Sequence, residues 1–161
     1  MNSEFYFFSI DKDRIEYFFD SIGPKGIINK RVRFLQTNFK GFFFLSFGDY
    51  NSETDEIDEY SVTNNDDTNK LIYTVVKIAI DFLQKNPLFF VQSSWRDELR
   101  LRLFNSWLNR NLCLMDSYLI IYGLIGELNN EKWERFQKNH RYKAVLIKLR
   151  NTDSQPKNKE V

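Results

Sequence analysis

Two serines and three arginines stand close together in the middle of the chain, at Ser93, Ser94, Arg96, Arg100 and Arg102. A serine before a helix caps its first free N–H groups, and such a helix start favours phosphate. Arg96 and Arg100 are four residues apart, so they would share one helix face with guanidinium groups suited to phosphate oxygens. The pattern predicts a site for phosphate or an acidic partner, with RNA or a nucleotide as ligand. A capped helix whose arginines pair with nearby carboxylates is the alternative.

Residues 49–67 form a second charged segment, with eight carboxylates and no lysine or arginine. Its alternating oxygen ligands resemble the start of a calcium loop, but Thr54 stands where that loop needs glycine and Tyr60 where it needs glutamate. We therefore expect no metal, and interpret the segment as a solvated loop that can dock a basic protein partner. The docking residues would be Asp49, Glu53, Asp55, Glu56, Asp58 and Glu59.

Basic residues also gather at 30–33 and 138–150, with aromatic residues between them. This mixture is typical of single-strand binding, although alternating polar residues on a half-exposed strand give the same pattern. His140 is the only histidine, so a histidine pair for RNA cleavage is excluded within one chain. Any catalysis would have to use arginine, lysine, tyrosine or carboxylates.

Motifs for nucleophilic or nucleotide-dependent enzymes do not occur in the sequence. Cys113 lies between leucines, which is typical of a buried and inert thiol. No cofactor is expected, and the sequence leaves open whether the protein is an enzyme.

The composition predicts one cytoplasmic domain with a large core. The 161 residues include 16 Phe, 8 Tyr and 3 Trp, and the net charge of +1 gives no bulk argument for nucleic acid or membrane. The single cysteine indicates a reducing compartment. We find no signal peptide, and the longest apolar run, 118–126, is about half the roughly 20 residues that span a bilayer.

The elements that must position these residues follow from hydrophobic spacing. Runs rich in Phe, Tyr, Ile and Val predict strands, with residues 23–26 as a tight hairpin between the second and third. Helical spacing over 71–83 predicts a helix that Asp66, Asp67 or Thr68 caps and that Asn86-Pro87 ends. A second helix would follow Ser93 or Ser94, and a short helix is expected near 133–137. The expected strands are 5–10, 14–21, 27–36, 41–48, 88–92, 118–124 and 142–149.

This order predicts a single α+β domain over residues 1–150, in which an antiparallel sheet that starts as a meander packs against two main helices. Residues 151–161 are polar and charged, and we expect a disordered tail.

Several short motifs of this chain resemble motifs of a known family. The motifs are Gly23-Pro24-Lys25-Gly26-x-Ile28-x-Lys30-x-Val32-x-Phe34, Leu45-x-Phe47-Gly48-Asp49, Ile57-Asp58, Asn64-Asn65-x-Asp67, Thr74-Val75, Phe82, Pro87, Tyr122-Gly123, Trp133-Glu134-x-Phe136 and Tyr142-x-Ala144. Over roughly Phe19 to Leu149 the chain resembles a family of uncharacterised Bacteroidota proteins, classed as a domain of unknown function. Similar proteins carry a Gly-Ser-Thr turn closely followed by Arg-x-Arg-Leu-Tyr, where this chain has Gln92-Ser93-Ser94 and, further on, Arg100-Leu101-Arg102-Leu103-Phe104.

The resemblance implies the fold and a cytoplasmic setting, but no reaction. Our first hypothesis is a binding protein, by analogy a component of a toxin–antitoxin or phage-defence cassette, whose protein partner would be a neighbouring-gene product. The alternative is a metal-independent ribonuclease-like toxin in which Arg96, Arg100 and Arg102 stabilise a phosphorane. A homo-oligomeric structural subunit is the third hypothesis.

Overall fold

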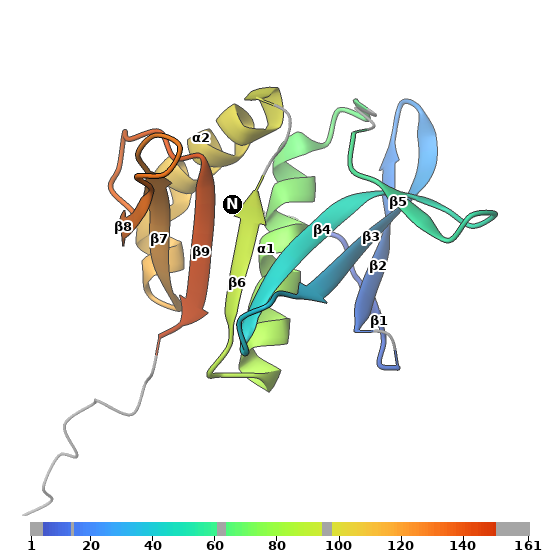
Figure 1. The fold of residues 1–161 in the computed structure, drawn as a ribbon. Coiled ribbons are helices and arrows are strands. Elements are labelled where there is room, and N and C mark those ends of the chain that lie inside the picture. Colours follow the sequence, from blue (N-terminus) through green and yellow to red (C-terminus); the bar gives the residue numbers. More distant parts are fainter. Residues whose placement is uncertain (1–4, 14, 61–63, 95–97, 151–161) are drawn as a thin grey trace, which may run out of the picture.

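In the computed structural model, which describes residues 5–13, 15–60, 64–94 and 98–150, nine strands form one sheet and two helices lie against it (Figure 1). The strands are β1 (Ser9–Asp11), β2 (Glu16–Gly23), β3 (Gly26–Gln36), β4 (Phe42–Asn51), β5 (Glu56–Asp58), β6 (Phe90–Ser94), β7 (Leu119–Ile125), β8 (Lys132–Arg135) and β9 (Ala144–Leu149); the helices are α1 (Thr68–Lys85) and α2 (Glu98–Asp116).

The sheet consists of two antiparallel halves joined by one parallel pair. Its order is β1-β2-β3-β4-β6-β9-β7-β8, with β5 paired to β4 off this path. β4 and β6 run parallel, with Phe42 opposite Phe90 and Phe44 opposite Gln92. Every other pairing is antiparallel, so the prediction of an α+β fold with a mostly antiparallel sheet is confirmed.

Strand alternation decides which side chains reach the helices. Along β3, Lys30, Val32 and Phe34 are buried, whereas Arg31 and Arg33 between them are half-buried on the other face. The Phe34 ring stacks on Phe82 of α1 at 3.9 Å between ring centroids. The core therefore lies between one face of the sheet and the two helices.

Helix α1 forms because its apolar residues recur at helical spacing. It starts and ends where the sequence predicts, but the side-chain hydrogen bonds at its start are not those of the predicted cap. Asp67 is the N-cap residue, yet its side chain makes no capping bond. Its Oδ2 instead accepts hydrogen bonds from Tyr6 (2.7 Å) and Ser21 (2.6 Å), which tie the helix start to the sheet. At the other end, Asn86 donates to the carbonyl of Phe82 at 2.9 Å, and Pro87 cannot continue the helix.

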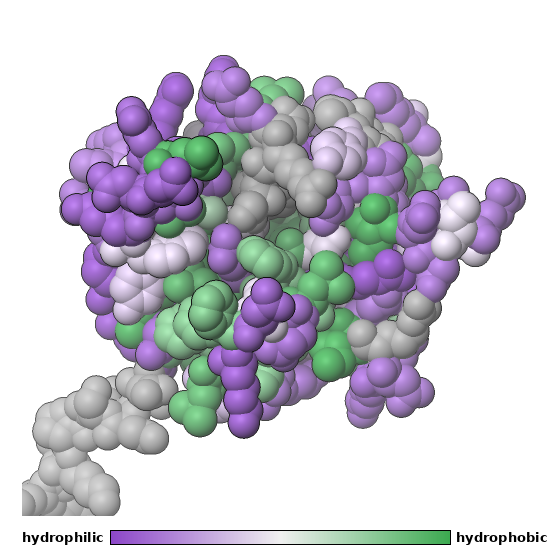
Figure 2. Space-filling model, in the orientation of Figure 1, coloured by the Kyte–Doolittle hydropathy of each residue, from purple (hydrophilic) through white to green (hydrophobic). Residues whose placement is uncertain are grey.

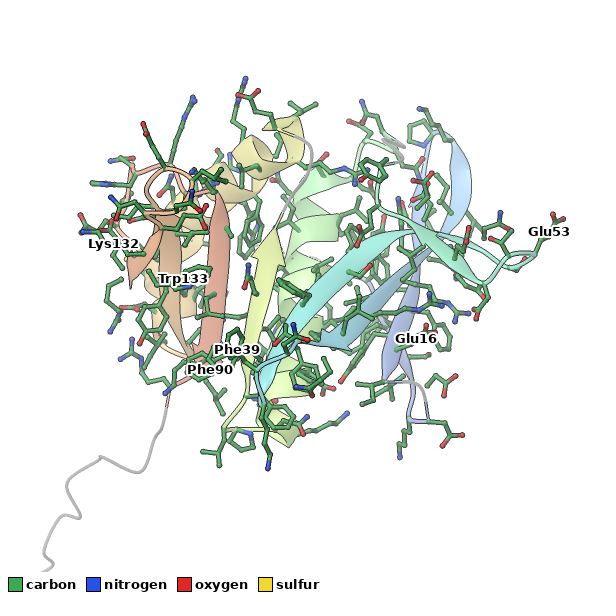
Figure 3. All side chains as sticks on the ribbon, in the orientation of Figure 1. Glu16, Phe39, Glu53, Phe90, Lys132 and Trp133 are labelled. Carbon is green, nitrogen blue, oxygen red and sulfur yellow. The ribbon has the colours of Figure 1, made fainter. Side chains whose placement is uncertain are left out.

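Both helices lie behind the sheet in Figure 1, and no described helix covers the opposite face. Figure 2 shows apolar side chains across the middle of that face, over β4 and β6, and hydrophilic side chains at the upper left, around the ends of β7 to β9. Phe39 and Phe90 lie on this open face, and Trp133 lies nearer the β8 edge (Figure 3).

Two local predictions were wrong. Residues 132–135 form strand β8 rather than a helix, because they pair with β7 from Tyr122 to Ile125. Cys113 is exposed rather than buried, since it lies on the solvent side of α2. Among the described residues, no helix is long and apolar enough to cross a membrane.

Candidate functional site

The serines and arginines that the sequence placed in one site are separated in the structure. Ser93 and Ser94 are the last residues of β6, where they pair with Val145 and Ala144 of β9. Ser93 lines an apolar cavity under the helices. The described part of helix α2 begins at Glu98, and Arg96 lies outside the described residues. The serines therefore belong to the sheet, and Arg96 cannot be placed.

Arg100 and Arg102 also have different environments. They are two positions apart on α2, so their side chains leave the helix in nearly opposite directions. Arg100 donates a hydrogen bond to the backbone oxygen of Glu59 and so ties α2 to the segment after β5. Arg102 is exposed and lines a pocket on the other side of the helix. Among the predicted serines and arginines that the structure describes, only Arg102 lines that pocket.

The pocket lies between α2 and residues 136–143, the segment that joins β8 to β9, and we call it the basic pocket. Its volume is about 520 Å³. It is lined by Glu98, Leu101, Arg102, Asn105, Ser106, Asn109 and Arg110 from α2, and by Lys138, Asn139, His140, Arg141 and Tyr142 from the segment. The α2 residues recur at spacings of three and four, so they form one helix face. In the sequence, only the arginines of this helix were interpreted as functional, so its polar face as a whole was not predicted.

Positive charge dominates the basic pocket. Arg102, Arg110, Lys138 and Arg141 line it, against the single carboxylate of Glu98. Arg110 donates to Oδ1 of Asn69 at 3.2 Å. The other three cations form no ion pair with any residue in the described ranges. An anion can therefore enter the pocket without displacing a protein carboxylate from them.

Tyr142 holds the 136–143 segment in place beneath the pocket. It is 1% exposed, its ring packs against Phe136 at 4.9 Å, and its hydroxyl donates to Glu134 (2.9 Å) and accepts from the backbone N–H of Gln137 (3.0 Å). Burial raises the pKa of this phenol, and the Glu134 carboxylate acts in the same direction against the opposing Gln137 N–H. A Cβ on Gly123 would lie 2.1 Å from the ring, so glycine is required there.

Two asparagines join the walls of the pocket. The backbone N–H of Asn139 donates to Oδ1 of Asn109 at 3.1 Å. Asn105, 7% exposed, donates through Nδ2 to the carbonyls of Leu101 (2.8 Å) and Tyr142 (3.5 Å). Its Oδ1 is buried and has no hydrogen-bond partner among the described residues. The pocket wall thus contains one acceptor that the protein leaves unsatisfied.

The acidic segment 49–67 is folded back on the sheet rather than wholly solvated. Asp49 pairs with Lys30, and Asp55 accepts from Arg33 (3.2 Å) and from the Tyr50 hydroxyl (2.8 Å). Residues 56–58 form β5 against β4, and Glu59 accepts from Ser46 at 2.5 Å. Four of the six predicted docking carboxylates, Asp49, Asp55, Asp58 and Glu59, therefore have partners within the chain, since Asp58 accepts from the backbone N–H of Tyr60 at 2.9 Å.

Three of the six docking carboxylates face solvent. Glu53, Glu56 and Asp58 are all exposed. Glu53 projects away from the body of the molecule at the tip of the β4–β5 hairpin, as Figure 3 shows. A docking surface on this segment would therefore be limited to the hairpin tip and β5.

Glu16 neutralises the basic residues of β3, a role that the sequence analysis missed. This carboxylate is 2% exposed and accepts from Arg31 at 2.8 Å and from Arg33. The Arg31 guanidinium also lies over the Tyr50 ring, 3.6 Å from its centroid. Because carboxylates already bind both arginines, the basic residues of this strand stabilise the sheet.

The motif glycines have a structural role as well. Asn65 accepts from the backbone N–H of Lys25 (2.8 Å) and donates to the carbonyl of Gly26 (3.1 Å), which fixes the predicted hairpin. A Cβ on Gly23 would lie 2.0 Å from the Asn65 carbonyl oxygen, and one on Gly48 would lie 2.1 Å from that of Asp58. The glycines of these motifs therefore allow close contacts between segments and do not form a ligand site.

Metal binding has no support in the described part of the chain, where no three His, Cys, Asp or Glu side chains converge. His140 lies on the wall of the basic pocket, and its ring is nearly parallel to that of Tyr142 at 6.3 Å between centroids. One imidazole, that of His140, and one carboxylate, that of Glu98, thus line this pocket.

Comparison with known proteins identifies a family whose model matches this chain. The family model of DUF6934, described as a family of unknown function, matches residues 2–150. Neither a curated protein nor a solved structure matches the chain.

Proposed function

The chain belongs to DUF6934, a family of unknown function, and we propose that it is a binding protein whose basic pocket takes a phosphate-bearing ligand. The observation that carries this proposal is the convergence of Arg102, Arg110, Lys138 and Arg141 on one cavity beside a single carboxylate.

The argument depends on what surrounds those charges. Like charges in a partly enclosed space repel one another, and the repulsion weakens when an anion binds between them. Arginine guanidinium groups present paired donors that match the oxygens of a phosphate group. Arg102 and Arg110 reach the cavity from α2 and Lys138 and Arg141 from the opposite wall, so one anion can be held from two sides. Nucleotides and the nucleotide units of RNA are phosphate-bearing ligands of a size that such a cavity accommodates.

Binding of inorganic pyrophosphate, measured by calorimetry at low salt, tests the proposal. We expect Arg102→Gln to weaken binding about tenfold, since hydrogen bonds to charged groups contribute about 1.5–3 kcal/mol. Lys12→Gln removes the same charge from the exposed turn between β1 and β2, and this control should change the affinity by less than about twofold. Absence of wild-type binding, or equal losses in both variants, would contradict the proposal.

A ribonuclease is the second candidate, because Glu98 and His140 lie on opposite walls of the same pocket and supply a carboxylate and an imidazole. In this version Arg102 stabilises the charge that develops on the phosphorus centre. Incubation of the protein with single-stranded RNA, beside His140→Gln, separates the two candidates. Intact RNA favours binding alone, whereas cleavage that the substitution abolishes favours the enzyme.

Docking of a basic protein partner on the exposed hairpin carboxylates is compatible with either candidate. A toxin–antitoxin or defence cassette would provide such a partner. The variant Glu53→Gln/Glu56→Gln/Asp58→Asn should lose co-purification of the partner while its unfolding midpoint stays the same. Unchanged co-purification would remove the docking hypothesis.

A further inference from the structure

We infer that the open face of the sheet binds a second copy of this chain, so that two sheets pack face to face around a two-fold axis. The inference concerns a surface separate from the basic pocket, because none of the residues on which it rests lines that pocket.

Strand register brings apolar side chains together on the open face. Leu35 of β3 lies opposite Phe44 of β4, and Phe42 of β4 lies opposite Phe90 of β6. Residues that lie opposite each other project on the same side of a sheet, so these four side chains share the face that the described helices leave uncovered. The loop between β3 and β4 adds Phe39, whose ring packs edge-on against Phe42 at 6.3 Å between centroids (Figure 3). We call these five residues the apolar patch.

The apolar patch is more exposed than the outer face of a solvated sheet should be. Phe39, Leu35 and Phe44 are 74%, 50% and 43% exposed. An antiparallel sheet that faces water normally carries polar residues on its outer side, whereas a contiguous exposed apolar patch marks an interaction site. Figure 2 shows apolar side chains gathered over β4 and β6. The patch therefore indicates that another surface covers this face.

The end of the chain is unsuited to cover the apolar patch. Residues 151–161, which follow β9, contain no aromatic residue and a single aliphatic one, Val161. A segment of this composition has little apolar surface to bury against five large side chains. The cover is therefore expected from another molecule.

The size of the open face agrees with a dimer interface. Eight strands follow one another across the sheet. At about 4.8 Å per strand and about six residues of 3.3 Å each, they present roughly 750 Å². Stable interfaces bury about 800 Å² on each partner. Two twisted sheets that stack face to face keep their strands within about 30° of each other, and a two-fold axis parallel to the strands meets this condition.

On the open side of the strands, cations lie toward the β8 end. Lys148 of β9 pairs with Phe90, and the register continues through Tyr122 of β7 to Arg135 of β8, so both cations project on the open side. Lys148 forms no ion pair with any residue that the structure describes. Arg135 lies 3.7 Å from Asp116, but both side chains are more than half exposed, so this pair contributes little.

Carboxylates lie at the other end of the molecule. Glu53, Glu56 and Asp58 are exposed on the β4–β5 hairpin, and Figure 1 shows β5 and β8 on opposite sides of β6. A rotation of 180° about an axis along the strands places the cationic end of each copy over the hairpin of the other. An axis across the strands would bring like charges together. The apolar patch thus supplies contact area and the charges select the orientation, with the second copy as a basic partner of the hairpin.

Sedimentation equilibrium of the full chain tests the inference. Interfaces of this size have dissociation constants of about 1 µM or below, so at about 50 µM we expect the mass of two chains. Leu35→Glu and Phe44→Glu each bring two charges, one from each copy, into the apolar contact, and each should reduce the mass to that of one chain. If a fall in the unfolding midpoint shows that either variant is unstable, Phe39→Glu replaces it, because Phe39 is the most exposed member of the patch.

Leu114→Glu is the matched control. Leu114 is 45% exposed, close to the value for Leu35, but it lies on α2 behind the sheet, so this variant should keep the mass of two chains. A wild-type protein with the mass of one chain overturns the inference, as does a dimer that the control disrupts and the patch variants do not. If the wild type is a single chain and the patch variants lose binding of single-stranded RNA, the face binds RNA and the inference is equally wrong.

An exchange of charges tests the orientation. Arg135→Glu/Lys148→Glu and Glu53→Lys/Glu56→Lys/Asp58→Lys each place like charges at both ends of the dimer, and each should weaken self-association about tenfold or more. In an equimolar mixture of the two variants, opposite charges meet again at both ends, so the mixture should recover the mass of two chains. Failure of the mixture to recover, or unchanged self-association of the separate variants, overturns the proposed arrangement.

Discussion

The molecule contains two clusters of basic side chains that differ in how their charges are balanced. On β3, Arg31 and Arg33 bind the buried carboxylate of Glu16, and Arg33 also reaches Asp55. In the basic pocket, Arg102 and Arg141 have no carboxylate partner in the described ranges. The same residue type therefore holds the sheet together in one place and is left available for a ligand in the other.

The comparison shows why sequence patterns of lysine and arginine are ambiguous. Both clusters have aromatic neighbours in the sequence, so they look alike there. The deciding fact is whether a carboxylate from another element comes within reach, and this depends on strand register and on helix packing. Three substitutions test the comparison.

The largest effect is expected for Glu16→Gln. Two guanidinium groups, 18% and 21% exposed, would lose their buried counter-charge, and we expect a loss of roughly 3 kcal/mol in the free energy of unfolding. Urea denaturation measures this quantity. A loss below about 0.5 kcal/mol is usual for surface positions. Such a small loss would mean that the ion pairs of the β3 cluster contribute no more to stability than the cations of the basic pocket do.

A somewhat smaller effect is expected for Gly123→Ala. The added methyl group would overlap the Tyr142 ring, and overpacking of this kind destabilises by about 1–3 kcal/mol. Because Tyr142 anchors the pocket wall, the variant should also weaken pyrophosphate binding. Ala at Gly26, where a Cβ would have no neighbour within 4 Å, is the control: it introduces only the strain of a positive φ and should leave binding unchanged. Equal binding by both variants and the wild type would show that Tyr142 does not organise the pocket.

The smallest effect on stability is expected for Arg141→Gln. Since this side chain is exposed and has no described ion-pair partner, the free energy of unfolding should change by less than about 0.5 kcal/mol. The same urea denaturation compares it directly with Glu16→Gln. A loss similar to that of the Glu16 variant would remove the distinction between the two clusters.

The sequence predicts the elements of this fold better than it predicts the site. The spacing of Val75, Ala79 and Phe82 is enough to identify α1, and alternation is enough to orient β3, because each pattern is local. Strand β8 was mistaken for a helix because Lys132–Arg135 is short and polar, and only its pairing with β7 makes it a strand.

The basic pocket depends on contacts between distant segments. Its walls come from α2 and from residues 136–143, and the bonds Asn105–Tyr142 and Asn109–Asn139 bring them together across 30 residues or more. The polar spacing of Arg102, Asn105 and Asn109 was visible in the sequence, but nothing local indicates what faces it. Glu16 was missed for the same reason, since its burial depends on the register of β2 with β3.

The parallel junction between β4 and β6 affects how fast this chain can fold. Strands β2, β3 and β4 pair as successive hairpins, whereas β6 pairs only with distant segments: Phe90 lies opposite Phe42, 48 residues earlier, and opposite Lys148, 58 residues later. Closing a loop of that length carries an entropic cost before any contact forms, and pairings between distant residues slow folding. We expect the insertion of β6 between β4 and β9 to limit the folding rate, so this step sets the time during which the edges of both half-sheets stay open to other chains.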